Sequence, residues 1–192
     1  LMPKGDTVAM KDEIVRLART LGIQPEWLAV DRTGNGQGVF DLLKYEWGVG
    51  VIGVNFSESP SETRIMVEDS DIAKELYDRV QSELWFALRK FIEFQYLKAL
   101  PGLETADLYP QLTGRLFRAT GKTAKGEGKP DYRSRNQGKS PADADAVSLL
   151  VHAARRASGV VPGMTPEHTL GTEDEDYYED EGARVDVTNS FS

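Results

Sequence analysis

Residues 30–43 read VDRTGNGQGVFDLL, and the aspartate near the start of this stretch is the first residue whose setting suggests chemistry. Asp31 ends a short apolar run, and three glycines follow it at every second position. An acid at the carboxyl end of a buried strand lies where open α/β sheets bind their ligands. A carboxylate there is costly unless a cation compensates it. Either the neighbouring Arg32 or a hard divalent cation such as Mg²⁺ could have that role.

The three glycines allow two interpretations. Gly34, Gly36 and Gly38, placed between a strand and a helix, are compatible with a loop that holds a pyrophosphate at a helix N-terminus. Their spacing is GxGxG rather than the dinucleotide-binding GxGxxG, and Asp31 would set a negative charge beside the phosphate. We therefore favour a tight strand-to-helix turn that needs positive φ angles, and keep a nucleotide-binding α/β enzyme as the minor alternative.

A second acidic pair, Asp143 and Asp145, stands in the stretch SPADADAVSLL, where a helix is expected to begin. We expect Ser140 to cap this helix, with Pro141 in its first position. Acidic residues stabilise helix N-termini, which is the simplest explanation of both aspartates. Helical spacing nevertheless places them on different faces, so at least one must point towards packed surface. His152 has no second histidine nearby, and we expect it to cover the core rather than bind metal.

Positive charge is concentrated in residues 115–139, which hold eight Lys or Arg side chains against Glu127 and Asp131. Such a segment is either a solvated hairpin or a surface that contacts several phosphates of a DNA duplex, and composition does not separate the two. The candidate DNA-binding side chains are Arg115, Arg118, Lys122, Lys125, Lys129, Arg133, Arg135 and Lys139.

The overall charge of the chain hides this segment. The 192 residues have a net charge of −8, but the chain from Glu167 onward carries nine acids and only Arg184 as a base, so residues 1–166 are neutral. A hydrophobic content of 40% is typical of a globular protein. The absence of cysteine excludes disulfides, thiol nucleophiles and zinc–thiolate sites. We find no signal peptide and no apolar run of membrane-spanning length, and so expect no membrane partner.

The elements that must position these residues alternate between helix and strand. We predict helices over residues 12–21, 38–46 and 71–100, strands over 27–31 and 49–56, two strands around a basic turn within 113–135, and a last helix from residue 140. This order predicts an α/β layered fold. We expect a domain over residues 1–159 and a disordered acidic tail over residues 160–192.

Four stretches together, VDRTGNGQGVFDLL, GVNF, RVQSELWFALRKFI and KPDYRSRNQGKSPADADAVSLL, resemble the C-terminal nuclease domain of the large terminase subunit of tailed bacteriophages. The match covers most of residues 10–157 in the family's order. The resemblance implies an RNase H-like mixed sheet flanked by helices. It also implies a two-metal endonuclease, with Mg²⁺ or Mn²⁺ as cofactor, that cleaves concatemeric double-stranded DNA during packaging in the host cytoplasm.

The resemblance also implies roles for particular residues. By position, Asp31 looks like the catalytic metal ligand of the central strand. The segment 140–146 resembles the motif that supplies the last acid, but Ala142 stands where the family has aspartate, so that role falls to Asp143 or Asp145. Thr33 and the three glycines would turn the chain beneath the DNA phosphates.

Two parts of the family's pattern are not found in this sequence. RNase H-like nucleases carry another metal-binding aspartate on the first strand of the sheet, and only eleven residues precede the helix expected at Asp12. The ATPase domain of the family also lies further upstream. We therefore expect a nuclease domain truncated at its N-terminus, with weak or absent cleavage by residues 1–192 alone. In the intact protein we expect an ATPase domain, the portal and the small terminase subunit as partners; the alternative is a non-catalytic DNA-binding packaging module.

Overall fold

The computed structural model describes residues 6–98 and 107–164, which form an α/β body around one long helix. The elements are α1 (Thr7–Thr20), the 3-10 turn η1 (Pro25–Trp27), β1 (Ala29–Asp31), α2 (Gly36–Glu46), β2 (Ile52–Val54), α3 (Ala73–Leu76), α4 (Val80–Glu93), α5 (Leu108–Gly114), β3 (Phe117–Thr120), β4 (Thr123–Gly126), α6 (Lys129–Arg135) and α7 (Ala142–Ser158). In the ranges described, no helix has both the length and the apolar character needed to cross a membrane.

Strands β1 and β2 form a parallel pair, joined by helix α2 as the crossover. Asp31 lies opposite Val54 in this pair, so both strands end at the same edge. Helix α1 packs against α2, and its Ile14 contacts the small core made by Val39, Leu43 and neighbouring residues. This unit places Asp31 at the end of a short strand whose three residues are half-buried, rather than at the end of the buried strand that the sequence suggested.

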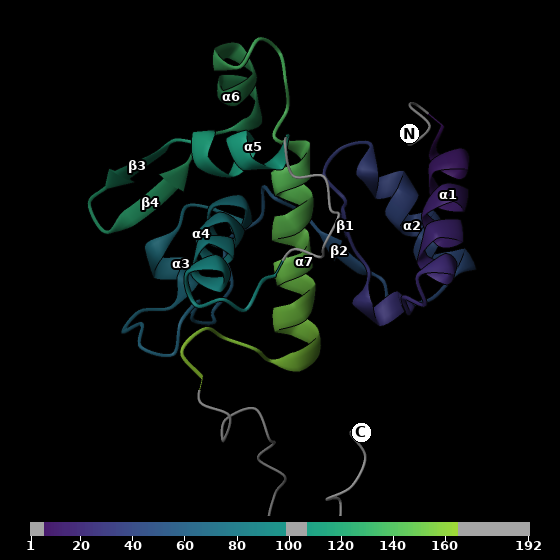
Figure 1. Cartoon of the computed structure of the whole chain (residues 1–192), viewed down its shortest axis with the longest axis horizontal. Helices are drawn as coiled ribbons and strands as arrows, with labels where there is room; N and C mark the ends of the chain where they lie inside the picture. Colours follow the sequence, from purple (N-terminus) through teal and green to yellow (C-terminus); the bar gives the residue numbers. More distant parts are fainter. Residues whose placement is uncertain (1–5, 99–106, 165–192) are drawn as a thin grey trace, which may run out of the picture.

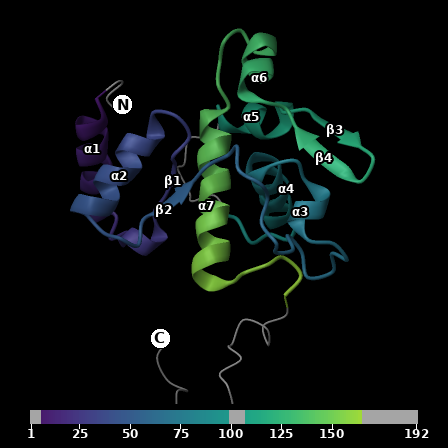
Figure 2. The same cartoon turned by 180° about the vertical axis from the view of Figure 1, so that it is seen from behind.

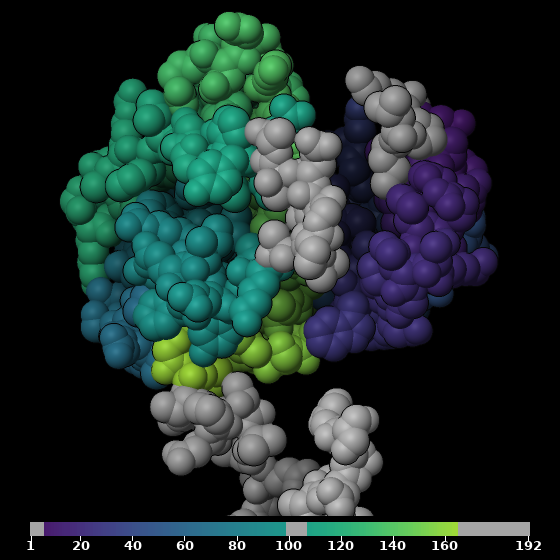
Figure 3. Space-filling model, in the orientation of Figure 1, coloured from purple at the N-terminus to yellow at the C-terminus, as the bar shows by residue number. Residues whose placement is uncertain are grey.

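Helix α7 runs through the middle of the molecule, with β1, α1 and α2 on one side and α3 to α6 on the other (Figures 1 and 2). The space-filling view shows the purple N-terminal helices and the teal and green helices as two masses flanking α7 (Figure 3). Leu149 of α7 packs with Val54 of β2 and Leu84 of α4, while Val151 packs with Phe91. The cluster around Leu149 thus joins the two sides of the molecule through α7.

The prediction of one continuous helix over residues 71–100 is wrong, because the helix is interrupted between the end of α3 at Leu76 and the start of α4 at Val80. Tyr77 adopts an extended backbone (φ −127°, ψ 151°) and forms a bridge to Ala124 of the hairpin. Its ring is buried and stacks on Phe86 at a centroid distance of 5.1 Å. A long-range pairing thus overrides a locally helical pattern. Helix α4 then ends at Glu93, and the last two residues of the predicted helix lie outside the described ranges.

The basic segment also differs from its prediction. Strands β3 and β4 form the expected antiparallel hairpin, with Gly121 at φ +60° in its turn. Residues 129–135, which we assigned to the hairpin, instead form α6, with Pro130 in its first turn, where a proline is well tolerated. Helix α5 has no counterpart in the prediction. Residues 160–164 pack on the body, where the Pro162 carbonyl accepts from Val67, and residues 165–192 of the expected tail lie outside the described ranges.

The expected cap of the last helix is replaced by a side chain from another helix. Helix α7 begins at Ala142 and no side chain of the Ser140–Pro141 stretch caps it. Instead, Oε1 of Gln111 in α5 accepts hydrogen bonds from the backbone N–H groups of Asp143 (2.9 Å) and Ala144 (3.2 Å). Helix α5 therefore holds the N-terminus of the helix that carries the acidic pair.

Candidate metal centre

Asp31 lies half-buried at the carboxyl end of β1. Its Oδ1 accepts a hydrogen bond from the backbone N–H of Thr33 at 2.8 Å, and its Oδ2 faces Nζ of Lys129 at 3.4 Å. Arg32 does not compensate this carboxylate in the structure, because its guanidinium pairs with Glu58. The negative charge at the strand end is therefore balanced by a lysine that lies 98 residues further along the chain.

Asp145 lies in the first turns of α7 and is 4% exposed. Its Oδ1 accepts a hydrogen bond from Nη1 of Arg115 at 2.9 Å. Its Oδ2 lies 3.0 Å from Nζ of Lys129, as an ion pair without a hydrogen bond, so this buried oxygen has no hydrogen-bond partner in the described residues. A buried carboxylate oxygen in this state is available to a further cation.

The two carboxylates have the same arrangement. Each has its Oδ1 anchored by an N–H donor and its Oδ2 turned towards a common point, where the Lys129 ammonium lies. Lys129 begins α6 and also lies 5.4 Å from the centre of the Phe56 ring. The structure thus brings together acids at positions 31 and 145 around one positive charge.

Asp143 does not join this group. It is exposed, and its Oδ2 accepts from Nε2 of Gln111 at 2.7 Å. Helical spacing predicted that the two aspartates of α7 face different ways, and the structure places Asp145 beside Asp31. The spacing alone left that choice open.

The glycine loop is a turn with two separate steric requirements. Gly34 has a φ of +59°, which favours glycine. Gly36 has an ordinary φ, but a Cβ there would stand 1.9 Å from the backbone oxygen of Asp31. Gly38 meets neither requirement; a Cβ there would lie 3.5 Å from Cγ2 of Thr7, an ordinary contact. Thr33 ties the loop to the chain after β2, since its Oγ1 accepts from the N–H of Phe56.

The eight predicted DNA-binding cations divide into three groups. Lys129 and Arg115 contact Asp145, and Arg115 is 6% exposed, so it cannot reach a phosphate in this arrangement. Lys122 pairs with acids of the α3 region, and Arg135 pairs with Glu127, whose pKa this contact lowers. Of these eight, Arg118, Lys125, Arg133 and Lys139 are exposed and have no ion pair within residues 6–98 and 107–164.

The two carboxylates supply some, but not all, of the ligands that a hard divalent cation needs. Within the described residues, no group of three or more His, Asp or Glu side chains could hold a metal ion. Mg²⁺, however, commonly binds through one or two protein carboxylates and keeps several waters. The two Oδ2 atoms offer that number of ligands, and a cation there would take the place of the Lys129 ammonium. The residues present therefore fit a metal that also draws ligands from water or substrate.

Comparison with known proteins gives the fold. No protein-family model and no curated protein matches the sequence. Among solved structures, the nuclease domain of the large terminase subunit gp2 of bacterial virus Sf6 is similar, with a TM-score of 0.60 and 17% identity over 75% of this chain and 71% of that one. Mutants of that domain solved with manganese (TM-score 0.58, 15% identity) and with calcium (TM-score 0.58, 16% identity) cover 75% of this chain, and 72% and 71% of theirs.

At these identities the similarity shows the fold alone. The chain has the α/β, RNase H-like fold of a phage terminase nuclease domain, as the four sequence stretches predicted. The contacts of Arg115 and Gln111 were missed, because each partner lies about thirty residues away on another helix and leaves no local pattern.

Proposed function

We propose that this chain is the metal-dependent endonuclease domain of a phage DNA-packaging terminase, which cleaves concatemeric double-stranded DNA. The observation that carries the proposal is the convergence of Oδ2 of Asp31 and Oδ2 of Asp145 on one point, in a fold shared with a terminase nuclease domain. We further propose that it acts in the host cytoplasm, together with an ATPase domain, the portal and the small terminase subunit.

Asp31 and Asp145 would hold Mg²⁺ or Mn²⁺ in a two-metal site. When bound, such ions supply the positive charge that polarises a phosphodiester and stabilises its leaving oxygen. The chain's own contribution is to fix the two carboxylates through Thr33 and Arg115, and to release Lys129 from between them. Lys129 is one-third exposed, so its ammonium can move outward and pair with a DNA phosphate.

DNA would be held by phosphate contacts without sequence preference. Hairpin residues Arg118 and Lys125, together with Arg133 of α6 and Lys139, present exposed positive charge on the elements that surround Lys129. Removing one cation that binds a phosphate should reduce the slope of log affinity against log salt by about 0.9. Replacing Arg118 and Lys125 with methionine should therefore lower that slope by about 2 without changing metal binding.

The metal site is tested by the thermal response to Mn²⁺. We expect Mn²⁺ to raise the melting temperature of the wild-type chain and of Asp143→Asn, but not of Asp31→Asn or Asp145→Asn. Asp143 is the matched control, because it lies two residues from Asp145 on the same helix but faces Gln111. An equal response in all four proteins would contradict the site.

Cleavage is tested on supercoiled plasmid at micromolar protein. We expect slow nicking that requires Mn²⁺, is retained by Asp143→Asn and is lost in Asp31→Asn and Asp145→Asn. Nicking that persists in both of these variants would come from another site or a contaminant, and would remove the support for the proposal.

One observation favours the alternative of a non-catalytic DNA-binding packaging module: only two acids converge within the described residues. A module of that kind would bind duplex DNA through the same cations. Asp31→Asn would then leave both DNA affinity and the thermal response to Mg²⁺ unchanged, which separates it from the nuclease.

A further inference from the structure

Arg115 is the most enclosed cation near the candidate metal centre, with 1% of its side chain exposed. It is the C-cap residue of α5, so it enters the site directly from the end of that helix. Its Nη1 donates to Oδ1 of Asp145 at 2.9 Å, and its Nε donates to the backbone carbonyl of Glu127 at 3.0 Å. One guanidinium thus connects α5, the end of the hairpin and α7.

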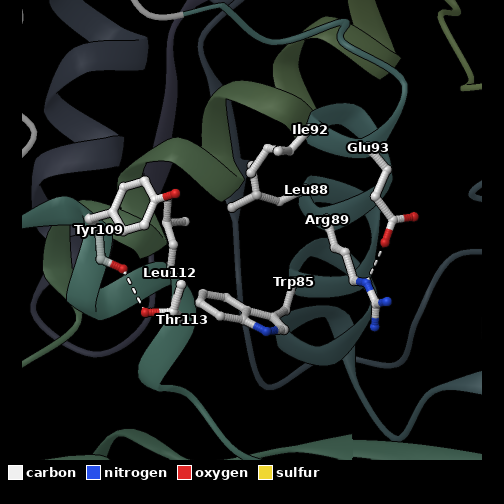
Figure 4. Close-up of a pocket in the computed structure, with 8 residues that line it drawn as sticks. All are labelled: Trp85, Leu88, Arg89, Ile92, Glu93, Tyr109, Leu112 and Thr113. Atoms are coloured by element: carbon white, nitrogen blue, oxygen red, sulfur yellow. Dashed lines mark hydrogen bonds and ion pairs between the residues drawn. The ribbon is translucent and has the colours of Figure 1, made fainter.

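The other side of this contact is the indole of Trp85. The guanidinium carbon of Arg115 lies 4.8 Å from the Trp85 ring centre, within the range of a cation–π interaction. Trp85 also lines an apolar pocket of about 240 Å³ between α4 and α5, together with Leu88 and Leu112 (Figure 4). The ring is half-buried, and the face that it presents to Arg115 limits the positions open to the guanidinium.

The buried ion pair between Arg115 and Asp145 is a poor source of stability, because both charged groups lose their hydration. Nη2 of Arg115 is buried without a hydrogen-bond partner in the described residues, as is Oδ2 of Asp145. Desolvation of a buried ion pair commonly offsets its attraction, and well-packed apolar residues often do as well or better. A buried pair with two unsatisfied atoms is therefore better explained by the orientation that it imposes.

We propose that Arg115 is a positioning residue for metal binding: by occupying Oδ1 of Asp145, it leaves Oδ2 as the oxygen that faces Asp31. This inference rests on the proposed function, since it concerns the same two carboxylates. Without Arg115, the Asp145 carboxylate can rotate and share its oxygens between Lys129 and other donors. Lysine is a poor replacement, because a single ammonium cannot serve Asp145 and the Glu127 carbonyl in a fixed fork while stacking on Trp85.

The test compares Mn²⁺ affinity in Arg115→Lys and Arg115→Met with that of the wild-type chain, measured by isothermal titration well below the melting temperature. We expect the dissociation constant to rise at least tenfold in both variants. Arg118→Met, three residues away and exposed, should bind Mn²⁺ within twofold of wild type but lose affinity for DNA.

A control is needed to show that a loss of stability does not by itself raise the Mn²⁺ dissociation constant. Val151→Ala, in the buried face of the same helix α7, serves as the control, because it removes core packing and leaves the site untouched. We expect it to melt at a lower temperature with an unchanged Mn²⁺ dissociation constant. If Arg115→Met does not fold, Arg115→Lys decides alone, since it keeps the charge beside Asp145.

The outcomes separate this inference from the proposed function. Weakened Mn²⁺ binding in the Arg115 variants, with nicking that persists in Asp31→Asn and Asp145→Asn, supports the positioning role and contradicts the endonuclease. Mn²⁺-dependent cleavage by wild type, with Mn²⁺ affinity unchanged in both Arg115 variants, overturns the positioning role and leaves the endonuclease standing. A wild-type chain that binds no Mn²⁺ overturns both.

Discussion

Replacing Lys129 with methionine removes the positive charge between the two carboxylates and its contact with the Phe56 ring, while keeping most of the aliphatic length of the side chain. The contacts of 3.0 and 3.4 Å to Nζ place the two Oδ2 atoms no more than about 6.4 Å apart, where two unit charges repel by about 3 kcal/mol at an effective dielectric constant of about 20, a repulsion that Lys129 offsets. Asp31 and Lys129 are both about one-third exposed, so solvent reduces this value. We expect Lys129→Met to lower the free energy of unfolding by about 1–3 kcal/mol in metal-free buffer.

The same substitution should strengthen the response to metal, because a divalent cation no longer competes with the ammonium. Stabilisation by a ligand grows as RT ln(1 + [L]/Kd), so Mn²⁺ at about one hundred times Kd contributes about 2.7 kcal/mol. Urea denaturation with EDTA and with Mn²⁺ measures both effects, and Lys125→Met on the exposed hairpin is the control. A variant as stable as wild type in EDTA, with the same gain from Mn²⁺, would refute the reasoning.

Three further substitutions test other parts of the structure. Gly36→Ala sets a methyl group against the Asp31 carbonyl, and should lower the free energy of unfolding by about 1–3 kcal/mol in urea denaturation. Arg155→Met leaves the buried Glu83 carboxylate without its ion pair, and should cost about 3–5 kcal/mol in the same assay. Burial lowers the pKa of His152 below its ordinary 6.5, so the folded state favours the neutral ring and loses stability as the pH falls below about 6.5. His152→Gln should flatten the fall in melting temperature between pH 7 and pH 5; an unchanged pH profile would contradict this.

The parts of the fold that were predicted correctly depend on local patterns. The apolar run before Asp31 and the glycines after it mark a strand, a turn and a helix within eighteen residues, from Ala29 to Glu46. The first helix, predicted from Asp12 but beginning at Thr7 in the structure, and the helix that carries Asp145 follow ordinary amphipathic spacing. The convergence of the acids, in contrast, was expected only through the resemblance to a nuclease family, because spacing alone does not place residues more than a hundred positions apart.

Most of the errors have long-range causes. Tyr77 lies in a pattern that favours helix, but its backbone pairs with the hairpin nearly fifty residues later. The N-terminus of α7 is capped by Gln111, which shows no local signal for that role. Helix α6 is seven residues long and mostly polar, too short for hydrophobic periodicity to reveal it. Arg115 was assigned to a DNA surface on charge alone, whereas the structure buries it against Asp145.

Shared binding of one ion of the proposed two-metal site by Asp31 and Asp145 is what the nuclease proposal depends on. Its most direct test is a crystal structure of the chain grown with Mn²⁺, with anomalous diffraction data collected above the manganese edge. We expect an anomalous peak in contact with Oδ2 of both aspartates, with the Lys129 ammonium displaced from its present position. A fully ordered site with Lys129 still between the carboxylates, and manganese bound elsewhere or not at all, would contradict it.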